Sequence, residues 1–166
     1  MLTLHAGFPA ALEALRVLNE AWPGRARARR EGSVADWRSR GGRLCRQVYG
    51  PAFARLVPAV RALHPDLAVW MIEHGYGRVL SRRGMSARDR ELVAVATLAA
   101  LGWERQLVSH LLGALRAGGT ERQIAVALRA GLVGAEDERR ASARSAWRRV
   151  AAADPRWRAR RTSRRV

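Results

Sequence analysis

The residues of this chain that could do chemistry together are Glu91 and His110. Each is a polar side chain in a segment whose pattern calls for apolar residues, on two successive predicted helices. If these helices form an antiparallel hairpin that bends at Gly102–Trp103, the carboxylate and the imidazole can approach each other. A carboxylate beside an imidazole in an apolar layer is an acid–base pair that can move a proton to or from a substrate.

Three consecutive helices between Leu80 and Leu128 must position this pair. The first is apolar on nearly every side, so we expect it to be buried. Small polar residues and glycines mark where the helices begin and end. These residues are Ser86 with Asp89, Gly102, Gly118–Gly119, and Thr120 with Gln123 as a capping box.

The rest of the chain also predicts helices, and no segment alternates as a strand would. We therefore predict an all-α fold of about eight helices around the central hairpin, as a single domain over 1–153 followed by a basic tail at 154–166. The other expected helices cover residues 8–22, 33–49, 52–63, a segment from Pro65 through Tyr76, and a last segment that ends near Ala153. Ser33 with Asp36 is the expected N-cap of the helix over 33–49.

Composition narrows the class of protein. The chain has 166 residues, and no apolar run reaches the roughly 18 residues of a membrane span. No secretory signal pattern is present at the N-terminus, which predicts a soluble cytoplasmic protein with no membrane partner. The single cysteine, Cys45, excludes an internal disulfide and a cysteine-based metal site. We expect no metal and no cofactor.

The formal net charge of +17 favours an anionic partner, but it has a second explanation. Every basic residue is arginine, as GC-rich coding alone would produce. Most of the excess lies at residues 25–50 (+6) and 131–166 (+7), outside the central helices. Arginine-rich arms at 25–46 and 139–165 would bind a polyanion or nucleic acid through phosphates, and Trp157 could stack on a base.

Residues 66–130 carry several short motifs at fixed spacing. They are Asp66-Leu67-Ala68-Val69-Trp70-Met71-Ile72-Glu73, Leu80-Ser81-Arg82-Arg83-Gly84-Met85, Arg90-Glu91-Leu92, Leu98-Ala99-Ala100-Leu101-Gly102 and His110-Leu111. Together these motifs resemble the carboxymuconolactone decarboxylase family, which includes alkylhydroperoxidase D-like proteins. The resemblance implies an all-α domain that assembles as a homotrimer or homohexamer, with its site near subunit contacts.

A second similarity is out of place. Residues 5–16 resemble the segment that ends the domain in typical family members, but here they begin the chain. Either the domain is circularly permuted, or its terminal helix is duplicated, since Leu4-His5-Ala6-Gly7 is echoed by Leu128-Arg129-Ala130-Gly131. Both versions predict that residues 6–22 pack against the central helices, in the place of the family's C-terminal helix.

The resemblance argues against thiol peroxidase chemistry. Alkylhydroperoxidase D-like members have a Glu, then a Cys-x-x-Cys, then a His, and the spacing matches Glu91 and His110. The two cysteine positions fall on Trp103 and Gln106. Attack on a peroxide needs a thiolate and a second thiol to resolve the product.

The decarboxylase branch of the family lacks those cysteines, so acid–base decarboxylation of a small lactone or carboxylic acid is the reaction that the resemblance implies. His110 would donate the proton, Glu91 would hold its tautomer, and Arg82 would clamp the anionic substrate. Further substrate-binding candidates are Glu73, Tyr76 and Glu104. Two alternatives stay open: a hydrogen-bonded core histidine in a non-catalytic family member, and the nucleic-acid binder above.

Overall fold

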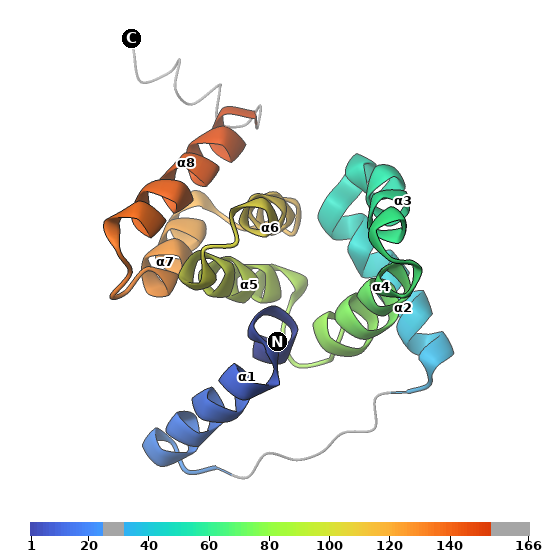
Figure 1. Ribbon diagram of the computed structural model, residues 1–166, viewed down its shortest axis with the longest axis horizontal. Helices are drawn as coiled ribbons and strands as arrows, with labels where there is room; N and C mark the ends of the chain where they lie inside the picture. The colour runs from blue at the N-terminus through green and yellow to red at the C-terminus, as the bar shows by residue number, and fades with distance from the viewer. Residues whose placement is uncertain (25–31, 154–166) are drawn as a thin grey trace. The chain divides into compact units, whose positions relative to one another are not determined.

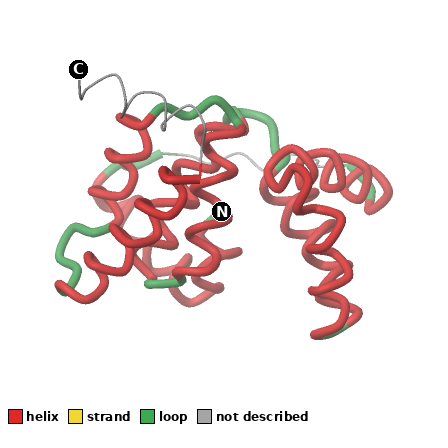
Figure 2. The backbone as a smooth tube through the Cα atoms, turned by 90° about the horizontal axis from the view of Figure 1, so that it is seen from above, coloured by secondary structure: helices red, strands yellow, loops and turns green. Residues whose placement is uncertain are grey.

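A computed structural model describes the chain at residues 1–24 and 32–153 (Figure 1). Over these residues every regular element is a helix (Figure 2), which confirms the all-α prediction. No helix in the same ranges is long and apolar enough to cross a membrane. Residues 25–31 of the predicted arm at 25–46, and the whole of the tail at 154–166, lie outside the described residues.

Two compact units make up the chain, Met1–Arg90 and Glu91–Val166, and each is described by itself. That residues 1–153 form a single domain stays a prediction. The elements of the first unit are α1 (Leu2–Ala21), α2 (Val34–Tyr49), the 3-10 turn η1 (Gly50–Ala52), α3 (Phe53–Leu63), α4 (Pro65–Trp70) and the π-helix η2 (Met71–Leu80).

The first unit is built on a close crossing of α2 and η2. Helix α2 begins at the predicted cap, where Asp36 N–H donates to Ser33 Oγ at 3.2 Å and Ser33 N–H donates to Asp36 Oδ2 at 2.8 Å. A Cβ atom on Gly41 would overlap the carbonyl oxygen of Ile72, and one on Gly77 would overlap that of Trp37. The two backbones therefore touch, and the core beside them contains Cys45, Val48, Tyr76 and Leu80.

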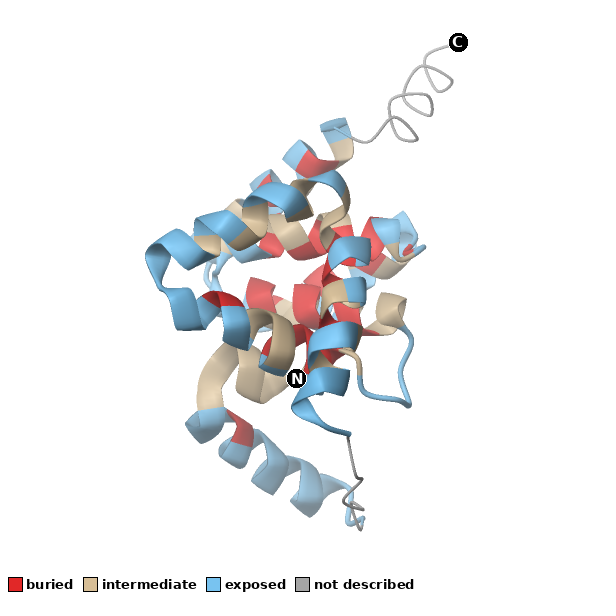
Figure 3. Ribbon diagram, turned by 90° about the vertical axis from the view of Figure 1, so that its right-hand side faces the viewer, coloured by how far each residue is buried: buried red, intermediate tan, exposed pale blue. Residues whose placement is uncertain are grey.

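Helix α1 is exposed over most of its length (Figure 3). Gly7, at φ 80° and ψ 175°, interrupts it, and the turn before Gly7 packs Leu4 against the core of its unit. Beyond Gly7 one row of large apolar side chains is between 52% and 78% exposed in the single chain. The row is Phe8, Leu12, Leu15, Leu18 and Trp22. The predicted helix is present, and its packing in the place of the family's C-terminal helix stays a prediction.

The second unit contains the three predicted central helices and the predicted last helix. They are α5 (Ala87–Leu101, whose first turn belongs to the first unit), α6 (Glu104–Arg116), α7 (Glu121–Gly131) and α8 (Asp137–Ala153). The caps are those that the sequence predicts, with Asp89 N–H donating to Ser86 Oγ at 3.1 Å and a capping box between Thr120 and Gln123. Gly131 sits against α5, where a Cβ atom would overlap the carbonyl oxygen of Ala96.

The expectation that α5 is buried holds for one side of the helix and is wrong for the other. Ala94, Val95, Leu98 and Ala99 are buried. Val93 and Leu101, in contrast, are 40% and 38% exposed in the single chain. An apolar side chain gives no sign of which side meets protein and which stays open, so composition alone overestimates burial here.

Candidate acid–base site

The bend between α5 and α6 brings Glu91 and His110 into contact. Gly102 ends α5 in a left-handed conformation (φ 74°), and the N–H of Trp103 donates to the carbonyl of Leu98 at 3.1 Å. This is the usual way for a glycine to close a helix and reverse the chain. His110 Nδ1 then lies 2.9 Å from Glu91 Oε2.

Both partners are withdrawn from solvent, with 2% of Glu91 and 6% of His110 exposed. Burying a carboxylate or an imidazole without a partner is costly, so their mutual hydrogen bond offsets part of the desolvation of each. An ionised carboxylate only accepts hydrogen bonds, so beside it Nδ1 carries the proton. Nε2 is then the nitrogen that would exchange a proton with a substrate, in the arrangement general acid–base catalysis uses.

Arg90 is a buried side chain that sequence reasoning left without a role. Its guanidinium donates to the backbone carbonyl of Arg82 and so ties the loop before α5 to the start of that helix. The Met1 amino group lies in the same unit, where burial first, and the charges of Arg82 and Arg90 next, lower its pKa. An arginine immediately before Glu91 in the matching motif was the available signal, and charge alone does not say that it is buried.

Glu73 and Tyr76, two of the predicted substrate-binding residues, are engaged within the first unit. The Arg38 guanidinium contacts Glu73 Oε1 at 2.6 Å through one terminal nitrogen and 2.7 Å through Nε. Tyr76 is buried in the core, edge-on to Tyr49 with ring centroids 6.0 Å apart. The side chain of Arg82 is exposed, and its backbone carbonyl accepts the bond from Arg90. Their roles toward a substrate stay predictions.

Glu104 joins α6 to α8. Ser142 Oγ donates to its carboxylate at 2.6 Å, and the Arg149 guanidinium contacts the other oxygen. The hydrogen bond from Ser142, then the one from Arg149, lowers the pKa of Glu104 below its usual 4.5. These contacts give Glu104 a structural task that its sequence position did not reveal, because both partners lie on a helix far along the chain.

The residues at the two cysteine positions of the family motif, Trp103 and Gln106, cannot supply thiol redox chemistry at this hairpin. Trp103 and Gln106 are both exposed side chains that flank the bend. The unit Glu91–Val166 contains no cysteine in its sequence. Cys45 is a fully buried residue in the core of the other unit.

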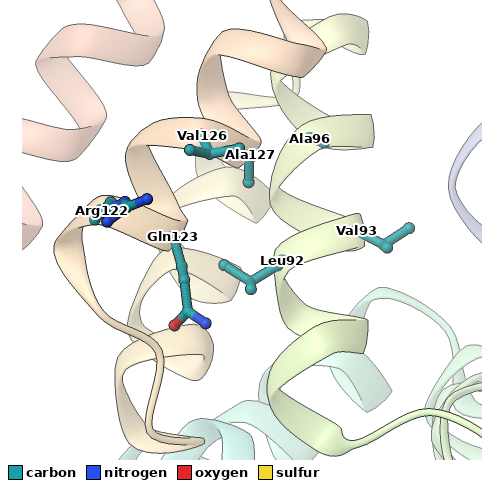
Figure 4. Close-up of a pocket in the computed structure, with 7 residues that line it drawn as sticks. All are labelled: Leu92, Val93, Ala96, Arg122, Gln123, Val126 and Ala127. Carbon is teal, nitrogen blue, oxygen red and sulfur yellow. The ribbon is translucent and has the colours of Figure 1, made fainter.

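An almost wholly apolar hollow of about 470 Å³ lies between α5 and α7 (Figure 4). Neither Glu91 nor His110 lines it, although Leu92 follows Glu91 directly. Its lining residues are Leu92, Val93 and Ala96 from α5, and Arg122, Gln123, Val126 and Ala127 from α7. Of the two large apolar residues of α5 that are exposed, Val93 belongs to the lining of this concave apolar surface and Leu101 does not.

A family model for the carboxymuconolactone decarboxylase family matches residues 65–149, just over half of the chain. The chain belongs to this family. The match runs from the start of α4 into α8, further than the predicted 66–130, and it includes both Glu91 and His110.

A curated relative gives a second comparison. Peroxisomal protein 2 of Schizosaccharomyces pombe (strain 972 / ATCC 24843) is 30% identical over 122 residues, which cover 71% of this chain. Those residues cover 57% of the relative, so the chain spans little more than half of that protein's length. This similarity is consistent with membership of the family.

Proposed function

We propose that this family member is an acid–base decarboxylase of a small lactone or carboxylic acid, with His110 as the proton donor. The observation that supports this most is the buried hydrogen bond between His110 Nδ1 and Glu91 Oε2. A buried acid–base pair in a member of a family named for a decarboxylase fits proton transfer better than any other chemistry at these residues.

The proposed reaction at this pair is a decarboxylation that ends in proton transfer to carbon. The bond between the substrate carbon and its carboxylate breaks, CO2 leaves, and the electron pair delocalises into the neighbouring lactone carbonyl. His110 Nε2–H then gives its proton to carbon, while Glu91 holds the ring and stabilises the cationic form that precedes the transfer. Solvent returns a proton to the imidazole afterwards. Arg82 keeps its proposed role as the clamp on a second carboxylate of a small anionic substrate.

The test is turnover of carboxymuconolactone, followed as CO2 release. His110→Ala should lower kcat at least a hundredfold, the lower range of general acid catalysis, because the proton donor is gone. His74→Ala is the matched control, since His74 is an exposed histidine of the first unit and should leave kcat unchanged. Equal kcat in wild type and His110→Ala would refute the catalytic role.

CO2 release by the wild-type protein tests the alternative of a non-catalytic family member, in which Glu91 and His110 are core residues only. That alternative is supported by their low exposure in the single chain. It predicts no CO2 release from the wild type with any lactone acid, together with a large loss of stability in His110→Ala.

A second candidate function is binding of a polyanion or nucleic acid. The observation that favours it is the excess of +7 at residues 131–166, part of which lies outside the described residues. Removal of residues 154–166 should then weaken binding to single-stranded RNA and reduce its dependence on salt. Unchanged affinity would dispose of this candidate.

We also propose that the protein assembles as a homotrimer or homohexamer. The support is the exposed apolar row on α1 and the apolar hollow beside α5, since large apolar patches on a single chain usually mark contact sites. Light scattering coupled to size exclusion should give three or six times the mass of one chain. A monomer at micromolar concentration would refute the assembly. A cytoplasmic location stays a prediction, which fractionation of the source cells would test.

A further inference from the structure

A second hollow in the unit Glu91–Val166 lies between α7 and α8 and has a volume of about 600 Å³. That volume is typical of sites for small organic ligands. Residues at helical spacing from α7 face residues at helical spacing from α8, and the turn between the helices closes one end. The lining residues are Ala125, Leu128, Arg129, Leu132, Val133, Gly134, Arg140, Ala143, Arg144 and Trp147.

The hollow combines an apolar floor with a cationic rim. Leu128, Leu132 and Ala143 form the buried part of its lining, and Trp147 contributes a half-buried aromatic ring. The charged residues in the lining are three arginines, with no acidic residue among them. A floor of this kind favours an apolar body, and guanidinium groups favour a carboxylate or phosphate.

These three arginines differ from neighbouring ones on α8 in how they are used. Arg139 donates to the carbonyl of Ala100, and Arg149 contacts Glu104, so both tie their helix to another element. Arg129 and Arg144 form no ion pair within the described residues. Arg140 donates through Nε to the carbonyl of Ala135 at 2.9 Å, a bond that does not use the terminal nitrogens of its guanidinium.

Three like charges around one apolar hollow repel each other, and nothing in the lining offsets that repulsion. An anion among them would replace repulsion with charge-assisted hydrogen bonds, and planar guanidinium groups bind carboxylate and phosphate oxygens in pairs. The indole of Trp147 offers a face on which a flat apolar body can stack.

We propose that the α7–α8 hollow binds an amphipathic anion, namely a carboxylate or phosphate carried on an aromatic or short hydrocarbon body. The anionic group contacts Arg129, Arg140 and Arg144, and the body lies on Leu128, Leu132 and Trp147. The site is separate from the proposed catalytic pair, because neither Glu91 nor His110 lines the hollow. Binding of the anion in this hollow therefore does not depend on whether the protein is a decarboxylase.

Three probes that share a naphthyl body, together with acetate, test this by calorimetry on the full chain. 1-Naphthoate and 1-naphthyl phosphate carry the two possible anions, 1-naphthalenemethanol carries the body without charge, and acetate carries the charge without the body. One or both naphthyl anions should bind at least tenfold more tightly than the alcohol and than acetate. Equal affinity for the alcohol, equal affinity for acetate, or no binding of either naphthyl anion at millimolar concentration would overturn the proposal.

Two charge-matched double variants locate the site. Arg129→Gln with Arg144→Gln should weaken binding of the naphthyl anion at least tenfold. Arg105→Gln with Arg148→Gln removes the same charge from exposed positions outside the hollow and should leave affinity within twofold. Equal losses in the two double variants would mean non-specific attraction and would overturn the site.

Two further measurements separate this site from the other proposals. His110→Ala should bind the naphthyl anion as tightly as wild type, even if it turns over no substrate, and a parallel loss would place the ligand at the catalytic pair instead. In NMR spectra the indole N–H signal of Trp147, assigned by its absence in Trp147→Phe, should shift when the naphthyl anion is added. Competition with single-stranded RNA is the last test. If RNA displaces bound 1-naphthyl phosphate at a lower concentration than 1-naphthoate does, the hollow is part of a nucleic-acid surface and the proposal fails.

Discussion

Replacement of Glu91 and His110, singly and together, tests the physical account of the buried pair. Removal of one partner from a buried ion pair leaves the other group desolvated and unpaired, which costs about 3–5 kcal/mol of stability if the pair is charged. For a neutral pair the cost is about 1–3 kcal/mol. Glu91→Leu alone and His110→Leu alone should therefore each lower the free energy of unfolding. The expected loss is about 3–5 kcal/mol for a charged pair and about 1–3 kcal/mol for a neutral pair.

The double replacement should cost much less than the two single ones combined. Leucine is close in volume to both side chains, and replacing a buried polar pair by packed apolar residues is often neutral or stabilising. The double-mutant cycle should thus give a coupling close to the sum of the two single losses, at least about 2 kcal/mol, because the double variant itself loses little stability. The assay is urea unfolding of each variant, followed by circular dichroism at constant pH.

Additive losses would refute this reasoning, because they would mean that each residue is held by other groups and not by its partner across 2.9 Å. The same variants separate stability from chemistry. A double variant that folds as well as wild type but releases no CO2 would show that the pair is retained for catalysis rather than for packing.

Three further predictions concern other features of the fold. Hydrogen bonds lower the pKa of Glu104, so the ionised carboxylate stabilises the fold above pH 4.5. This stabilisation is lost as the pH falls further and the carboxylate is protonated. The difference in melting temperature between wild type and Glu104→Gln should therefore shrink towards pH 3. A constant difference would contradict that. Gly131→Ala should destabilise the protein by about 1–3 kcal/mol in urea, because its methyl group would overlap the carbonyl of Ala96. Gly24→Ala is the control, because Gly24 is exposed, has no positive φ and leaves room for a methyl group. Thr120→Ala should cost about 1 kcal/mol through loss of the bond that Gln123 N–H donates at 3.3 Å, and a loss below 0.3 kcal/mol would count against the cap.

The features that the sequence predicted correctly are those set by residues close together in the chain. The caps at Ser33, Ser86 and Thr120 each depend on a side chain three residues away, so local pattern identifies them. The approach of Glu91 to His110 depends on one bend, at Gly102, between two adjacent helices. A short hairpin leaves few alternatives for which faces meet.

The features that it did not predict depend on contacts between distant segments. The π-helical turn of η2 occurs where Gly77 lies against the backbone of α2, and side-chain pattern does not record a widened helical turn. Glu104 is held by Ser142 and Arg149, which lie on α8 and carry no signal of that pairing. An arginine-rich chain also offers many partners for every carboxylate, so charge pattern does not single out the pairs that form.

Access to His110 is the remaining condition for catalysis, because 6% of it is exposed in the single chain. Assembly of subunits can only bury surface further, so a substrate would reach Nε2 through local opening of the α5–α6 hairpin. Such openings cost less than global unfolding and occur in the native state.

Diethyl pyrocarbonate, which modifies accessible imidazoles, should therefore label exposed His64 and His74 at once and His110 slowly. If the site is catalytic, the slow labelling rate of His110 must not change at low urea concentration, because urea promotes global unfolding much more than local opening. A substrate analogue must also slow this labelling further. Labelling of His110 only at the rate of global unfolding would make it a core histidine.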